Sequence, residues 1–157
     1  MGKTLVHVSV DRTTATTVGL LRRALGDLAD KYEKFAHLTI LEPGTQLDMP
    51  ENLRESVNAY VRRYSSRFSA AAVVFEQAGF QATVVRSLVT ATHVAAQATH
   101  PSRVFEDLKS AATWMCGLTP GESMVRLYDA VLQLRRDAGV SSTRRPPTSM
   151  PPEKSQR

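Results

Sequence analysis

The chain has 157 residues, a length that fits one domain able to bury roughly two thirds of its unfolded surface. Its one cysteine, Cys116, excludes an intramolecular disulfide and favours a reducing, cytoplasmic compartment, and no apolar run approaches the roughly 18 residues of a membrane span. Of the net charge of +5, residues 140–157 carry +3 and the other Lys and Arg residues are scattered in pairs, which argues against a specific nucleic-acid binder.

Strand and helix patterns alternate from the start of the chain. Residues 4–10 alternate in apolarity, which predicts a flanking strand with one face in the core and a less apolar face that is partly exposed. An apolar stripe at helical spacing follows, from Val18 to Tyr32, with threonines before it as N-cap candidates. Gly19 and Gly26 weaken this helix, which suggests that it approaches the sheet closely.

A second strand and helix repeat the pattern. Residues 35–41 alternate in the same way, and a Pro-Gly pair ends the strand that they predict. Asp48 and Glu51 have the spacing of a capping box, with Pro50 early in the helix. We therefore expect a second helix that begins there and ends near Ser65.

The longest apolar stretch, residues 69–96, predicts a buried strand and the helix that covers it. Residues 70–75 form a continuous apolar run, which is typical of a strand covered on both faces at the centre of a sheet. Apolar residues recur at helical spacing after Gly79, so the chain turns there and a helix packs back on the sheet.

The last part of the folded region predicts one short strand and two helices. Residues 103–105 are long enough for only a short strand, after which Asp107 caps a helix. Residues 119–122 read Thr-Pro-Gly-Glu, the order of an N-cap, a proline at the first helical position and an acid at the third. This order predicts a last helix that runs to Gly139.

The order of these elements predicts an α/β fold. We expect a mostly parallel four-stranded sheet with alternating helices, plus an extra C-terminal helix, in one domain at residues 1–139. Residues 140–157 are rich in Ser, Thr, Pro, Arg and Lys and have almost nothing to bury, so we expect a disordered tail there.

Two histidines form the most interesting polar pair. His7 and His37 each lie on the less apolar face of a predicted strand, and parallel pairing would bring them to one side of the sheet. No Cys or carboxylate stands beside them at ligand-like spacing, whereas a zinc site needs three or four protein ligands. We therefore expect surface or hydrogen-bonded histidines, no metal and no cofactor. His100, just past the end of a helix, is explained by the helix dipole.

Three further positions lie where open parallel sheets bind ligands, at the carboxyl ends of the strands. Asp11 and Glu42 follow the first two strands, and we interpret them as solvated acids because no third polar group converges on them. Gly79 precedes a helix N-terminus, but a lone glycine lacks the spacing of a phosphate-binding loop, so a plain turn is favoured. With His7 and His37, these residues form the predicted interaction or ligand surface.

Two short motifs, GFQATVVRS at residues 79–87 and VFEDLKSAATW at residues 104–114, carry a resemblance to a known family. Over about residues 4–118 the chain resembles the small STAS-like (SpoIIAA-like) single-domain proteins of the myxobacterial type. The resemblance implies a non-enzymatic regulatory domain that binds a protein partner under the control of a phosphorylated Ser or Thr. The loop at residues 76–79 has no hydroxyl, so no phosphorylation site is carried over. The alternative is a small-ligand or lipid-binding module of the same fold.

Overall fold

A computed structural model describes residues 3–77 and 79–140 of the chain. The strands are β1 (Thr4–Ser9), β2 (Phe35–Leu41), β3 (Phe68–Phe75) and β4 (Ser102–Phe105). The helices are α1 (Ala15–Lys31), α2 (Glu51–Tyr64), α3 (Phe80–Ala95), α4 (Leu108–Leu118) and α5 (Met124–Asp137). All but the first residue of the predicted tail at residues 140–157 lie outside the described residues.

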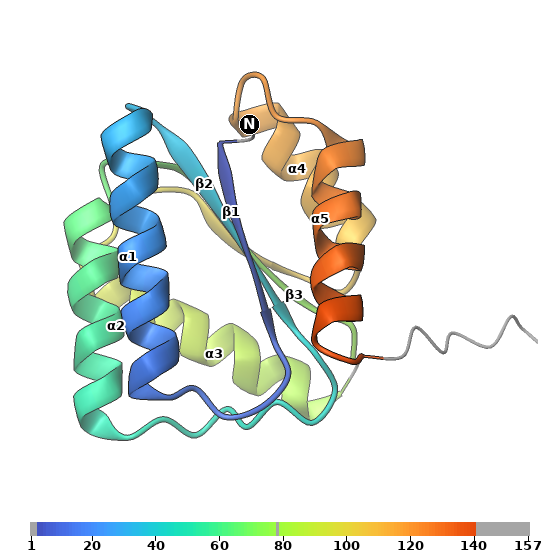
Figure 1. Ribbon diagram of the computed structural model, residues 1–157. Helices are drawn as coiled ribbons and strands as arrows, with labels where there is room; N and C mark the ends of the chain where they lie inside the picture. The colour runs from blue at the N-terminus through green and yellow to red at the C-terminus, as the bar shows by residue number, and fades with distance from the viewer. Residues whose placement is uncertain (1–2, 78, 141–157) are drawn as a thin grey trace, which may run out of the picture.

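The four strands form one parallel sheet in the order β1-β2-β3-β4 (Figure 1). Neighbours in the sheet are also neighbours along the chain, and a helix connects each pair because parallel strands need a crossover. The structure thus confirms the predicted α/β fold with alternating helices and one extra helix at the C-terminal side.

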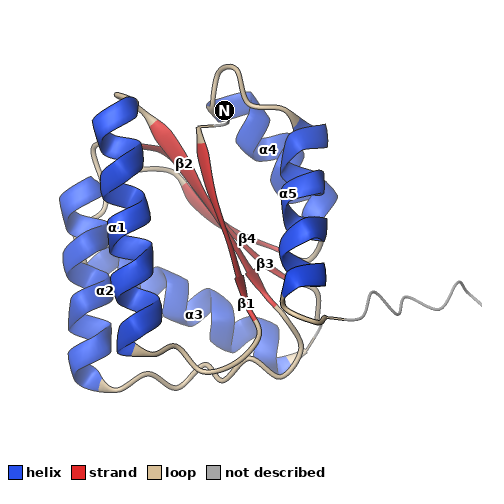
Figure 2. Cartoon of the chain, viewed as in Figure 1, coloured by secondary structure: helices blue, strands red, loops and turns tan. Residues whose placement is uncertain are grey.

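Helices cover both faces of this sheet (Figure 2). The three crossovers share one hand, so α1, α2 and α3 lie together on one face. α4 follows the last strand and packs with α5 on the opposite face, where α4 lies beside β3 and α5 beside β1. The sheet is therefore the middle of three layers, and alternate side chains of each strand face different helical layers.

The α4–α5 face holds a continuous apolar core. Ile40 and Val74 are fully buried there, together with Met115 of α4 and Val131 of α5. β3 has a strand on each side and a helical layer on each face, so the predicted central, doubly covered strand is confirmed.

The other face is built from two separate clusters. At the N-terminal ends of the strands, Phe35 and Phe68 pack edge to face, 5.2 Å apart, against Tyr64 and the helices α1 and α2. At the C-terminal ends, Phe75 packs with Val85 of α3. Large side chains therefore separate the helices from the sheet at both ends of the strands.

This second face corrects the expectation of a partly open surface on β1. The helices α1 to α3 cover it, and Ser9 on that face is only 8% exposed. Val10, which the alternation placed on the core face, is 42% exposed because β1 ends at Ser9. Polar strand residues were expected to face water, but here they face the interior.

Two of the predicted helix starts are confirmed. The hydroxyl of Thr14 accepts the backbone N–H of Thr17 at 3.2 Å at the start of α1. The carboxylate of Asp107 accepts the N–H of Ser110 at 2.7 Å at the start of α4. Both bonds satisfy N–H groups that have no partner within the helix.

Two other predicted caps are wrong. α2 has Pro50 at its N-cap and no side-chain hydrogen bond there, so Asp48 forms no capping box. Thr119 ends α4 and does not begin α5, because its hydroxyl is buried 2.7 Å from the hydroxyl of Ser69 in β3. In this second case a tertiary contact replaces the local bond that the sequence pattern predicted.

The glycines of α1 do not mark an approach to the sheet. A Cβ added at Gly19 would meet nothing within 4 Å, and one added at Gly26 would lie 3.6 Å from the hydroxyl oxygen of Tyr64 in α2. The close approach at Gly26 is therefore between α1 and α2.

Candidate functional site

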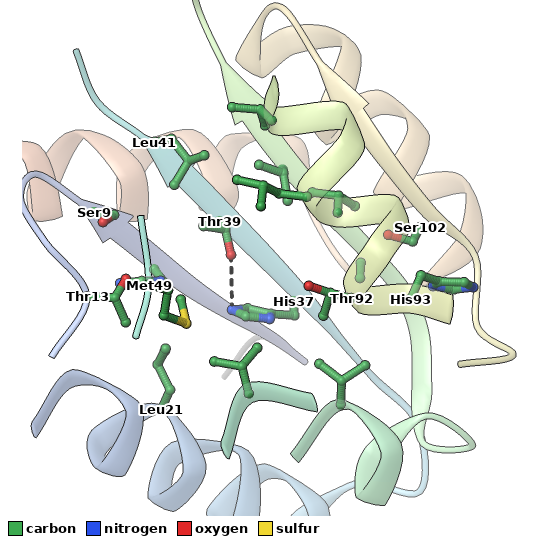
Figure 3. A pocket seen from close by; sticks show the side chains of 18 of the residues that line it. Ser9, Thr13, Leu21, His37, Thr39, Leu41, Met49, Thr92, His93 and Ser102 are labelled. Atoms are coloured by element: carbon green, nitrogen blue, oxygen red, sulfur yellow. Dashed lines mark hydrogen bonds between the residues drawn. The ribbon is translucent and has the colours of Figure 1, made fainter. Parts of the chain in front are cut away.

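A cavity of about 230 Å³ lies between the sheet and the layer of α1, α2 and α3 (Figure 3). Its floor is the covered polar face of the strands, with His7 and Ser9 from β1 and His37 and Thr39 from β2. Apolar side chains of the three helices form most of the walls, such as Leu21 of α1, which points toward the sheet.

The sizes of the strand side chains explain why space remains here. Ala71 of β3 pairs with His37 in the sheet and extends only a methyl group toward the helices. The phenylalanines at both ends of the strands hold the helical layer away, and the smaller side chains between them do not reach it. Protein interiors are normally packed densely, so a cavity of this size is unusual for a protein interior.

His37 lies at the centre of the cavity floor. Its Nε2 is 3.3 Å from Oγ1 of Thr39, and its ring stacks on that of Phe68 with 6.3 Å between centroids (Figure 3). Burial lowers the pKa of His37 from 6.5 to about 3, with further lowering by His7 and His100. The imidazole is therefore neutral at physiological pH.

His100 and His7 have the same character. His100 is 7% exposed, its Nδ1 is 3.2 Å from Oγ of Ser65, and its ring lies 5.2 Å from that of His93. Burial, and then His93, lowers the pKa of His100 to about 4. Burial also lowers the pKa of His7. All three histidines are thus held in the uncharged form by loss of contact with water.

Some polar groups of the lining have no partner. The side chains of His7 and Tyr60 make no hydrogen bond within residues 3–77 and 79–140. Tyr60, on α2, is 8% exposed, and burial raises its pKa to about 12. Both groups line the cavity, so their polar atoms are available to a bound molecule that supplies a hydrogen-bond partner.

The cavity adjoins a groove between α2 and α3. Leu47 and Met49, in the loop before α2, line both the cavity and the groove, as do Val57 of α2 and Leu88 and Thr92 of α3. These shared lining residues show that the cavity and the groove adjoin each other. Asn58 lies in the same groove, and its Oδ1 is buried without a hydrogen-bond partner among the described residues.

The structure separates the five residues of the predicted surface. His7 and His37 line the same cavity, as parallel pairing predicted, but they are interior and not surface residues. Asp11 is exposed at the end of β1. Gly79 is exposed as the N-cap of α3, where its φ of 90° is one that glycine adopts readily.

Glu42 is not a solvated acid. It is 6% exposed and pairs with Arg135 of α5, whose guanidinium also lies 3.2 Å from the carboxylate of Glu76. These ion pairs fix the end of α5 to the carboxyl ends of β2 and β3. The interpretation as a solvated strand-end acid is therefore wrong for Glu42, and the partner residue lies 93 positions away.

Three polar residues of the cavity were missed or misinterpreted. His100 was explained by a helix dipole, yet it is buried and lines the cavity. Thr39 and Tyr60 were treated as ordinary strand and helix positions. The available signal was that hydroxyls and imidazoles recur on the same face of β1 and β2, in His-x-Ser and His-x-Thr.

The described part of the chain holds no group of three or more His, Cys, Asp or Glu residues placed to bind a metal ion. His37 and His100 have hydroxyl neighbours, and no carboxylate is among the described residues that line the cavity. The arrangement is suited to hydrogen bonding in an apolar surrounding.

The fold and the site define a three-layer α/β protein with an internal, uncharged cavity. Comparisons with protein-family models, curated proteins and solved structures found no match to the chain. The resemblance to STAS-like proteins therefore stays a prediction. Among residues 3–77 and 79–140, no helix is both long enough and apolar enough to cross a membrane.

Proposed function

We propose that this protein is a non-enzymatic module that binds a small, mostly apolar molecule between its sheet and the layer of α1, α2 and α3. The observation that supports this proposal most is the cavity itself, with apolar walls and a floor of imidazole and hydroxyl groups. Ligand sites in proteins combine apolar walls with a few polar groups in this way.

The cavity volume limits the size of the ligand. A cavity of roughly 150 Å³ holds benzene, and sites for drug-sized molecules begin at roughly 300 Å³. At about 230 Å³, the cavity suits a molecule of about 10 to 12 non-hydrogen atoms. We expect millimolar to micromolar dissociation constants, which correspond to about 0.4 to 0.8 kcal/mol per atom and lie in the lower part of the range of about 0.3 to 1.5 kcal/mol per atom seen for ligands.

The lining supports binding more than catalysis. A hydroxyl nucleophile needs a histidine base that a third group orients, commonly a carboxylate. The described lining supplies histidines and hydroxyls but no carboxylate.

The test uses naphthalene and 2-naphthol, two compact probes of the expected size. Their binding is monitored through chemical shift changes in the NMR spectrum of the full chain. We expect at least one probe to bind and to shift signals of residues on β1, β2 and α3. Ala71→Leu should abolish binding because it fills the cavity, whereas Ala138→Leu, at an exposed position after α5, should not. If neither probe binds, the proposal is wrong.

A second candidate function is the binding of a protein partner, as the resemblance to STAS-like proteins implies. One observation favours it: Phe80, next to Gly79 at the start of α3, is 83% exposed. Exposed aromatic residues are common at interfaces. Phe80→Ser should then eliminate one dominant partner recovered with the wild-type chain, and an unchanged set of captured proteins would exclude this surface.

A further inference from the structure

The charge state of the ligand follows from the groups around the cavity, provided that the proposed function holds. We propose that the cavity selects an uncharged molecule with an apolar body and one hydroxyl or carbonyl oxygen, and that it excludes carboxylates and amines of the same shape. The inference rests on three features of the lining.

First, no Asp, Glu, Lys or Arg is among the described residues that line the cavity. Asp48 and Arg54 line the adjoining groove and not the cavity, and Arg54 pairs with Glu51. Other charged side chains are engaged elsewhere. Glu42 pairs with Arg135 of α5, Arg62 donates to the backbone carbonyl of Ala95, and Arg67 donates to the carbonyls at the end of α1. A charged ligand would therefore lose its hydration without gaining a counterion, which is strongly unfavourable.

Second, the titratable groups that face the cavity are imidazoles and one phenol. These groups are His7 of β1, His37 of β2, Tyr60 of α2, His93 of α3 and His100 before β4. The bonded partners of His37 and His100 are hydroxyls, which do not favour the charged imidazole as a carboxylate would. Burial lowers the pKa of His7, His37 and His100 in agreement with this geometry.

Third, polar groups remain for a ligand oxygen, and the two that we consider are an imidazole and a phenol. His7 and Tyr60 line the cavity and have no hydrogen-bond partner among the described residues. The tyrosine hydroxyl donates or accepts, and the neutral imidazole offers one donor and one acceptor. A hydroxyl or carbonyl oxygen satisfies such groups without introducing a charge.

The proposal predicts that the affinity for an acidic ligand depends on pH and that the affinity for a neutral ligand does not. Because the pKa values of His37 and His100 lie at about 3 and 4, these two imidazoles present the same uncharged form to a neutral ligand from pH 7.5 to pH 5.5. A carboxylate needs a proton, on itself or on a histidine, and its affinity should rise as the pH falls.

The experiment compares naphthalene, 2-naphthol and 2-naphthoate by NMR titration of the full chain at pH 7.5 and pH 5.5. We expect 2-naphthol to bind with an affinity that changes less than twofold between the two pH values. We expect 2-naphthoate to bind at least tenfold more weakly at pH 7.5, and more tightly at pH 5.5 than at pH 7.5. Equal or tighter binding of 2-naphthoate at pH 7.5 would overturn the inference while leaving the proposed function intact.

Two variants test the contact with the ligand oxygen. His7→Phe and Tyr60→Phe should each lower the affinity ratio of 2-naphthol to naphthalene about three- to tenfold, the usual effect of one hydrogen bond. Tyr64→Phe is the matched control, because Tyr64 lies on α2 outside the cavity lining and should leave the ratio unchanged. If neither variant changes the ratio, the oxygen contact is refuted. The comparison with 2-naphthoate needs no variant, and failure of all three probes would refute both proposals.

Discussion

The burial of His37 makes the stability of the fold depend on pH. Its ring is placed on Phe68 and beside Thr39, under the helices of the α1–α3 layer. The folded chain therefore holds it uncharged, whereas the unfolded chain exposes it to water and allows it to bind a proton near pH 6.5. Because the two states bind protons differently, the free energy of unfolding must depend on pH.

The sign of this dependence can be stated. Because the pKa of folded His37, about 3, lies below 6.5, the unfolded state binds more protons, and stability is lost as the pH falls from 6.5 toward 3. At pH 5 the loss due to His37 is about 2 kcal/mol. We predict that His37→Gln reduces the difference in unfolding free energy between pH 7.5 and pH 5 by about this amount, as measured by urea unfolding.

Thr39→Val is the control for this prediction. It removes the hydroxyl beside His37 but no titratable group, so the dependence on pH should remain as in the wild type. A His37→Gln variant with the wild-type dependence would show that His37 is accessible to protons in the folded chain.

At the scale of elements, β3 shows how one strand serves two different layers. Ala72 faces the continuous core under α4 and α5, where it is 1% exposed, and Ala71 faces the cavity under α1 to α3. The two residues are adjacent in sequence and chemically identical. Their surroundings differ only because successive strand side chains point to opposite faces.

A pair of matched substitutions tests this difference. Ala72→Leu should destabilise the fold by about 1 to 3 kcal/mol, because added atoms have no room in a filled core. Ala71→Leu should be neutral or stabilising, because the larger side chain fills a cavity and buries apolar surface. Thermal and urea unfolding measure both. Equal destabilisation by the two variants would mean that the α1–α3 face is as tightly packed as the other.

At the scale of the whole molecule, the sequence concentrates net charge in the last residues of the chain. Residues 141–157 include Arg144, Arg145, Lys154 and Arg157 against Glu153 and carry +3 of the net charge of +5. Their composition offers almost no apolar surface for burial. We therefore expect residues 141–157 to carry most of the net charge but to contribute little to the stability of the fold.

Deletion of residues 141–157 tests this division. We predict a change of less than about 2 °C in the thermal midpoint, since a segment with almost no apolar side chains to bury is expected to contribute little to stability. Elution from a heparin column should shift to lower salt, because most of the net positive charge is removed. A larger loss of thermal stability would indicate that these residues dock on the fold, and unchanged elution would locate the basic surface within residues 3–140.

Much of the fold was determined by the sequence alone. The second strand is observed at the predicted residues, Phe35–Leu41, and the helices follow their apolar stripes. The order of elements and the parallel sheet follow as well. These features depend on the period of apolar residues and on chain connectivity, which are local and can be identified in one sequence.

The tertiary structure alone decided the character of the site. His7 and His37 looked like residues of an open face, but helices α1 to α3 cover that face and make it the floor of a cavity. Glu42 looked solvated, yet it pairs with Arg135, a residue 93 positions away. The alternation of side chains along a strand shows which of them share a face. Only the packing of distant elements determines whether that face meets water, a helix or an enclosed space.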